Sequence, residues 1–279
     1  MSKKYLDLNS DVLFSFFKLS DWKERAFMVG GLHLLGVLIY ILAIILFFIP
    51  IIGWAIAFII LMLLPFLIMV VNFLIDGYKL ELIEASRKGH SHKKIPFNNN
   101  YMPRIKQGFY VGIANLVYNL PIIIVYFFSI ALLFSPVFLL MSSAGTSNET
   151  QEVLGVFGVF GSMIVFYILI FAIYIYQLLY SIFIYPVMFL LYSRKNSLRE
   201  ALDIKAVFSF LKNNFLNICL YALITVVVSF VFGFLLSISF FLIFLCIGFV
   251  VAPVVFAVGL TYLVHLQAEL TAQLDLQSK

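Results

Sequence analysis

The amino-acid sequence predicts an all-α polytopic membrane protein: a transmembrane helical bundle of about six spans, arranged as three hairpins and preceded by an amphipathic N-terminal helix. Of its 279 residues, 64% are hydrophobic and only 11% are charged, whereas soluble domains are about 45–50% apolar and about 25% charged. The hydrophobic residues gather in long runs without any Lys, Arg, Asp or Glu. Runs of roughly 18 or more such residues are typical of membrane spans.

Six such runs are expected to cross the bilayer as helices, because a helix satisfies its own backbone hydrogen bonds in lipid. The runs are 26–49, 51–75, 108–140, 154–192, 215–236 and 239–266. The third and fourth are longer than the roughly 20 residues that cross the hydrocarbon. Both contain proline, so tilted, kinked and projecting helices all fit them.

Four polar or amphipathic segments flank the three predicted hairpins, 26–75, 108–192 and 215–266. These segments are the lead 1–25, the loop 76–107, the linker 193–214 and the tail 267–279. They contain all 18 Lys and Arg residues, while the loop on the opposite side has only Glu149 and Glu152. This distribution follows the positive-inside rule and places the four segments, with both termini, in the cytoplasm.

The lead 1–25 contains an apolar face of the kind that lies on a membrane surface. Four residues share this face at helical spacing: Val12, Leu13, Phe16 and Phe17. We therefore expect an interfacial helix on the cytoplasmic leaflet. Asp21, with Glu24 three residues later, resembles a capping box that would begin the first spanning helix.

The predicted spans contain no charged residue at mid-membrane depth. Ion-coupled transporters and proton pumps usually need such a group, so its absence argues against these classes. Amide side chains remain, and they allow two interpretations. They form hydrogen bonds between helices, or they line a polar cavity made by Asn72, Asn115, Asn119 and Gln177.

A cluster of basic residues in the loop 76–107 is a candidate contact for anionic lipid head groups. Its members are Arg87, Lys88, Lys93 and Lys94. The alternative is that these charges only set the topology. The net charge of +5 is thus explained by the membrane surface and does not require nucleic acid.

Signals for chemistry are absent from the sequence. It has no H-E-x-x-H, G-x-S-x-G or P-loop motif, so we expect no enzyme and no cofactor. His90 and His92 lack the further ligands of a zinc site, which favours a solvated loop over a metal site. Cys219 and Cys246 both lie in apolar runs and are interpreted as free thiols.

Four stretches resemble a known family. They are "FKLSDWKERAFMVGGLHLL", "NFLIDGYKLELIEASRKGHSHKKIPFNNNYMPRIKQGFYVGIANLVYNLPIII" and "VFSFLKNNFLNICLYAL" with the later "YLVHLQAELTAQL". Together they are similar to the prokaryotic membrane proteins of domain of unknown function 4013. Many members have an acidic, tryptophan-rich loop where this chain has Asn98 to Asn100 and Tyr101. The resemblance implies a multi-pass protein of a prokaryotic plasma membrane and implies no activity.

Two functions fit these observations. The first is a non-enzymatic scaffold, or a membrane component that binds a partner or lipid, with the bilayer, anionic lipids, another membrane protein or a second copy as partner. The alternative is a permease-like subunit for a small or amphipathic solute, suggested by the proline-containing spans and the amides. A polar cavity open to one side would favour the permease.

Overall fold

The computed structural model describes residues 6, 10–89, 95–143, 149–242 and 247–277. Within these residues all regular elements are helices, which confirms the predicted all-α class. The chain divides into two compact units. The first unit is Met1–Gly112 with Pro186–Lys279, and the second unit is Ile113–Tyr185.

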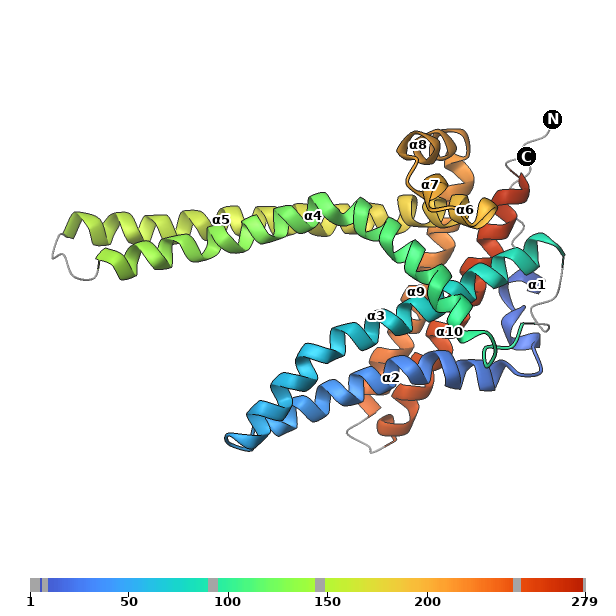
Figure 1. Ribbon diagram of the computed structural model, residues 1–279, viewed down its shortest axis with the longest axis horizontal. Helices are drawn as coiled ribbons and strands as arrows, with labels where there is room; N and C mark the ends of the chain where they lie inside the picture. The colour runs from blue at the N-terminus through green and yellow to red at the C-terminus, as the bar shows by residue number, and fades with distance from the viewer. Residues whose placement is uncertain (1–5, 7–9, 90–94, 144–148, 243–246, 278–279) are drawn as a thin grey trace. The chain divides into compact units, whose positions relative to one another are not determined.

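Figure 1 shows the helical elements in chain order. They are α1 (Ser10–Leu13), the 3-10 turn η1 (Phe16–Lys18), α2 (Trp22–Leu46), α3 (Ile52–Arg87), α4 (Tyr101–Ser143), α5 (Glu149–Leu179), the π-helical turn η3 (Tyr180–Ile184), α6 (Tyr185–Lys195), α7 (Leu198–Ala201), α8 (Ile204–Asn213), α9 (Phe215–Phe241) and α10 (Gly248–Gln277). In the part of the chain that the structure describes, six stretches are long and apolar enough to cross a membrane. They are Trp22–Leu46, Ile52–Arg87, Tyr101–Leu132, Gly158–Lys195, Phe215–Phe241 and Gly248–Gln277. The number of spans agrees with the prediction.

Two helices continue well past the apolar runs that predicted them. α3 runs on from Ile75 to Arg87, and α10 runs on from Leu266 to Gln277. Many residues of both continuations are buried in the first unit. Tertiary packing therefore extends each helix beyond its apolar run, into residues that are less hydrophobic than the run itself.

Four long helices, α2, α3, α9 and α10, form the frame of the first unit (Figure 1). α10 packs against α2, α3 and α9, and α2 also packs against α3. Glycines permit the closest approaches, since a Cβ added at Gly30 would collide with the backbone of Ala257, and one at Gly108 with the backbone of Phe73. Small residues at helix contacts are the usual means of tight packing in membranes.

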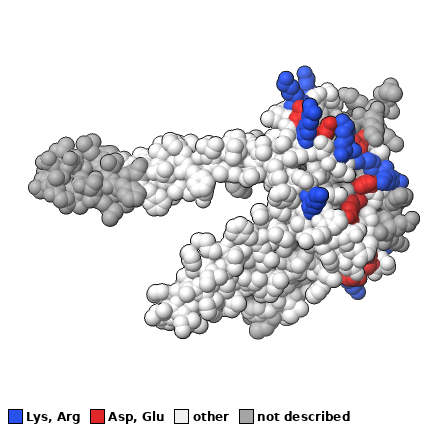
Figure 2. All heavy atoms as spheres, viewed as in Figure 1, with Lys and Arg blue, Asp and Glu red and all other residues white. Residues whose placement is uncertain are grey.

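The densest packing of the first unit lies among its charged helix ends. Buried residues concentrate in the last third of α3, in α6 and in the second half of α10. The apolar stretches instead expose many large hydrophobic side chains, as expected of surfaces that face lipid. Figure 2 shows Lys, Arg, Asp and Glu gathered on one part of the first unit. The core thus sits where the charges are, and the spans extend from it.

The N-terminal lead forms two short helical pieces, α1 and η1, which pack on α10. Phe16 is buried, with its ring centroid 5.0 Å from that of His265, and Phe17 stacks on Tyr262 at 5.4 Å. Phe16 and Phe17 therefore contact protein, while Phe14 is exposed. The predicted capping box is wrong: Asp21 occupies the N-cap of α2 but makes no side-chain cap hydrogen bond, because its carboxylate accepts from Arg25.

The second unit is a helical hairpin made by α4 from Ile113 onward, α5 and η3. Its chain runs as a regular α-helix to Leu179 and then widens into the π-helical turn. Pro186 lies two residues after Ile184, the last residue of this turn. Proline lacks a backbone N–H, and its ring clashes with the carbonyl four residues earlier in an α-helix, so a wider turn accommodates it.

Candidate functional site

One recess of the first unit is an apolar groove between α2, α3 and α10. Its volume is about 250 Å³, slightly below the roughly 300–1,000 Å³ of small-molecule pockets. It is lined by Leu32, His33, Gly36, Val37, Tyr40, Leu64, Leu67, Ile68, Val71 and Phe256. All ten residues lie inside the predicted spans, so the groove opens where a membrane places hydrocarbon.

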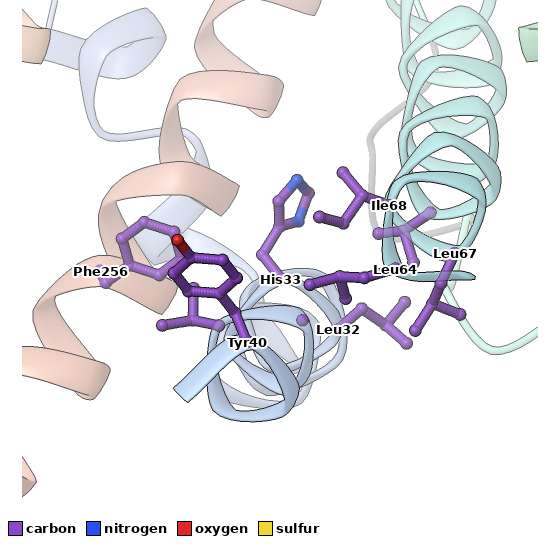
Figure 3. Close-up of a pocket in the computed structure, with 10 residues that line it drawn as sticks. Leu32, His33, Tyr40, Leu64, Leu67, Ile68 and Phe256 are labelled. Carbon is purple, nitrogen blue, oxygen red and sulfur yellow. The ribbon is translucent and has the colours of Figure 1, made fainter. Parts of the chain in front are cut away.

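A histidine is the main polar feature of this groove. Figure 3 shows His33 between the rings of Tyr40 and Phe256 on one side and Leu64, Leu67 and Ile68 on the other. His33 Nε2 lies 3.2 Å from Asn72 Oδ1. His33 Nδ1 lies 3.4 Å from the carbonyl oxygen of Val29, so each ring nitrogen faces an oxygen that can only accept.

Asn72 stands at the edge of the groove and is exposed. Its Oδ1 lies within hydrogen-bond distance of the His33 ring, and its amide nitrogen has no hydrogen-bond partner among the described residues. An amide nitrogen carries two N–H donors. The groove therefore combines an apolar floor with a hydrogen-bond donor at one end.

In the second unit, amide and tyrosine side chains form a ladder that joins α4 to α5 and η3. Gln177 Nε2 donates to Asn119 Oδ1 at 2.8 Å, and Tyr180 Oη donates to Asn115 Oδ1 at 2.7 Å. Asn119 Nδ2 also donates to Asn115 Oδ1 at 2.8 Å. A further rung runs from Tyr176 Oη to the carbonyl of Tyr118.

The four amides of the predicted polar cavity lie in two different places. The ladder brings Asn115, Asn119 and Gln177 together as hydrogen-bond partners, while Asn72 lies in the first unit beside His33. The geometry of the three is that of interhelical bonding, the first of the two interpretations that the sequence allowed.

A buried chain of hydrogen bonds links α2, α3 and α10 at the charged end. Arg25 donates to Asp21 Oδ2 at 2.8 and 2.9 Å and to Tyr78 Oη at 2.8 Å. Tyr78 Oη lies 3.1 Å from His265 Nε2. Since the hydroxyl oxygen accepts from Arg25, its proton is free to point to the imidazole. Arg25, Tyr78 and His265 are all buried, so this chain fixes three helices without reaching a groove.

A second buried cation holds α4 and the preceding loop onto α3. Arg104 donates through Nε and Nη2 to Glu81 Oε2 at 3.0 and 2.7 Å. Its guanidinium also donates to the carbonyls of Pro96 and Phe97 at 2.9 and 2.6 Å, and it lies 4.9 Å from the centre of the Tyr78 ring. Every part of the guanidinium thus has a partner.

A third cluster closes α10 onto α3 and α6. Asp275, 1% exposed, lies 2.5 Å from Arg87 Nε and 2.6 Å from Arg194 Nε. Arg87 also donates to the Ser193 hydroxyl at 2.7 Å and to the Ser193 carbonyl at 3.0 Å. One carboxylate therefore neutralises two cations from different helices.

This geometry bears on the basic cluster proposed for anionic lipid. Arg87 is engaged with Asp275 and Ser193, while Lys88 is exposed and pairs with Glu84 one helical turn away. Lys93 and Lys94 lie outside the described residues. Lys88, Lys93 and Lys94 stay a predicted lipid contact, and Arg87 has a packing role.

Among the residues that the structure describes, no group of three or more His, Cys, Asp or Glu side chains could hold a metal ion. His90, His92 and Cys246 lie outside them, and Cys219 is a free, partly exposed thiol. The guanidinium groups of the buried clusters remain protonated in proteins.

Sequence reasoning missed the residues that build the charged core. Arg25 sits four residues after Asp21, and this spacing was a readable sign of an ion pair on one helix. Tyr78 is 53 residues from its partner Arg25. His265 is 187 residues from its partner Tyr78. Nothing in a single sequence marks such distant pairs.

The model of a family described as "Protein of unknown function (DUF4013)" matches residues 59–241. This match extends from α3 to the end of α9 and covers both the second unit and the Arg104 cluster. No curated protein and no solved structure matches the chain.

Proposed function

The chain belongs to the DUF4013 family, whose description names no activity, and from its own residues we propose that it is a non-enzymatic membrane component that binds a lipid in the groove between α2, α3 and α10. The observation that carries this proposal is the groove itself, an apolar recess within the spans with His33 and Asn72 at one end. A lipid has the same pattern, a hydrocarbon chain beneath a polar group.

Affinity for such a lipid would come from shape and from one polar contact. Lipid tails are as apolar as leucine, so the hydrophobic effect favours no particular lipid-facing surface. A recess differs because it surrounds the hydrocarbon tail of the lipid with more protein atoms than a flat surface does. Each close pair of carbon atoms contributes about 0.1–0.2 kcal/mol of dispersion energy. The Asn72 amide would donate to an ester or phosphate oxygen of the lipid.

The permease alternative has weaker support. It needs polar side chains facing a pathway, whereas Asn115, Asn119 and Gln177 bond to one another or to Tyr180 across the hairpin. Reconstituted protein should therefore move no solute. A flux that Asn115→Leu or Asn119→Leu abolished would instead favour the permease.

The orientation of the protein is part of the proposal. The described charges of the first unit gather at its helix ends, and the positive-inside rule puts this end in the cytoplasm of a prokaryotic cell. The polar end of the groove, at Asn72, would then lie near the cytoplasmic leaflet, since it is close to the end of the span 51–75.

Native mass spectrometry of protein purified in mild detergent tests the lipid site. The wild type should retain a lipid that survives purification. Gly36→Leu should lose it, because a Cβ at this position already reaches Ile68 at 3.5 Å and the rest of the leucine would fill the groove. Gly31→Leu on the same helix is the matched control, since a Cβ there meets nothing within 4 Å.

A second pair of variants covers the case in which Gly36→Leu does not fold. Leu67→Trp places a large ring on the groove lining, and Phe66→Trp places the same ring at the neighbouring exposed position. Lipid retained equally by all four variants, or absent from the wild type, would contradict the proposal.

A further inference from the structure

The helix α8 (Ile204–Asn213) has three distinct faces. Val207 and Phe210 are buried in the first unit, and the Arg194 guanidinium lies 5.2 Å from the centre of the Phe210 ring. At about 100° per residue, Ile204 and Phe208 fall on a second face, about 110° from the buried one. Both side chains are exposed, by 55% and 56% respectively.

Two lysines border one side of this exposed apolar face. On the same wheel, Lys205 and Lys212 project about 80–100° from Ile204, on the side away from the buried residues, and both are exposed. The polar side chains of Ser209 and Asn213 follow further round. An apolar stripe bordered by lysines is the pattern of helices that lie in a membrane interface, where lysine reaches up to the head groups.

The position of α8 in the chain puts it at the membrane surface. α8 is followed after one residue by α9, whose apolar stretch is one of the six candidate spans. Figure 1 shows α8 at one end of α9, as a separate short helix. Its own start is fixed by Asp203, which accepts from the Ala206 backbone N–H at 3.0 Å. The exposed stripe continues in Phe215 at the start of α9.

We propose that α8 is an interfacial helix that inserts Ile204 and Phe208 into the leaflet where α9 begins, with Lys205 and Lys212 binding the phosphates of anionic lipids. Its occupant is the membrane itself, because the stripe sits one residue from a span and its charges are positive. This surface is separate from the groove of the proposed function, and it can exist whether or not the groove holds a lipid.

Fluorescence quenching in vesicles tests the insertion. A bimane label is attached to Phe208→Cys or, as matched control, to Ser209→Cys, in full-length protein whose native cysteines are replaced by alanine. The protein is reconstituted into phosphatidylcholine vesicles with and without phosphatidylglycerol. Ile204→Cys is a second reporter that keeps the Phe208 ring in place.

The label at Phe208 or Ile204 should be quenched several times more strongly by doxyl-labelled lipid than the label at Ser209, and less by aqueous iodide. Phosphatidylglycerol should strengthen this difference. Lys205→Gln with Lys212→Gln should remove the strengthening and leave the value in pure phosphatidylcholine unchanged.

Three outcomes would overturn the proposal. Equal quenching at Phe208 and Ser209 would mean that the stripe does not enter lipid. Protection from both quenchers would mean that another protein surface covers it. A response that neither phosphatidylglycerol nor the lysine replacements change would refute the binding of anionic lipid.

Discussion

Replacing Arg104 with methionine should be among the most destabilising single substitutions in the first unit. Arg104 is 1% exposed and satisfies the Glu81 carboxylate and the carbonyls of Pro96 and Phe97. Methionine keeps much of the volume but donates no hydrogen bond. The change therefore leaves a carboxylate without its cation and two carbonyls without a donor.

The size of the loss follows from these contacts. Removing one partner of a buried ion pair costs about 3–5 kcal/mol, because the other charge remains uncompensated. Glu81 is 24% exposed, so water recovers part of its solvation and the lower limit, about 3 kcal/mol, applies. For chains of about this size, that loss corresponds to a fall of roughly 6–12 °C in the unfolding midpoint.

The assay is the temperature at which half of the detergent-solubilised protein is lost from its monodisperse peak in size-exclusion chromatography. Lys88→Met is the matched control, since it removes the same type of charge from the exposed pair with Glu84. Exposed pairs contribute about 0–1 kcal/mol, so the control should move the midpoint by no more than about 2–4 °C. Adding Glu81→Leu to Arg104→Met should restore part of the lost stability, because it removes the uncompensated carboxylate.

The reasoning would be refuted if Arg104→Met and Lys88→Met shifted the midpoint equally. It would also fail if the double variant were no more stable than Arg104→Met alone. In that case the charge left on Glu81 would not be the source of the loss.

Three further predictions concern other parts of the molecule. Asp275→Ala should lower the same midpoint, because it removes the buried carboxylate that pairs with two partly exposed cations, Arg87 and Arg194; an effect of less than about 2 °C, or roughly 1 kcal/mol, would contradict the packing of α10. Gly30→Leu should abolish the monodisperse peak, since its side chain would meet the α10 backbone, while Gly31→Leu should retain it. In a background without native cysteines, Ser147→Cys should react with an impermeant thiol reagent in intact cells, and Ser91→Cys only after permeabilisation. The opposite pattern would invert the orientation, and labelling of both would contradict the six-span count.

The sequence was sufficient to predict the class and the number of spans. Charge-free runs such as 26–49 are long enough to be recognised without any knowledge of their partners, because lipid acts on each helix separately. The boundary at Leu266 predicted from hydropathy does not coincide with a helix end, since α10 runs on to Gln277. Its continuation is held by contacts such as that of Asp275 with Arg87, which hydropathy does not measure.

The candidate site was less predictable. The groove depends on how three helices approach one another, and no local pattern around His33 or Phe256 reports that distance. Asn115 and Asn119 were recognisable as polar residues within a span, but a single sequence could not choose between a cavity and a hydrogen-bond ladder. Their partner Tyr180 lies 65 residues from Asn115, in a turn whose π-helical form depends on the following proline.

The order in which a ribosome makes this chain gives the Asp275 cluster a particular role. Arg87 and Arg194 are synthesised long before the carboxylate that neutralises both of them. Until α10 emerges, the first two hairpins can enter the membrane, but the core at the charged end lacks the carboxylate that pairs with Arg87 and Arg194. A chain that lacks Asp275 would thus have an incomplete core at its charged end, and completion of the fold would depend on the last helix to be synthesised.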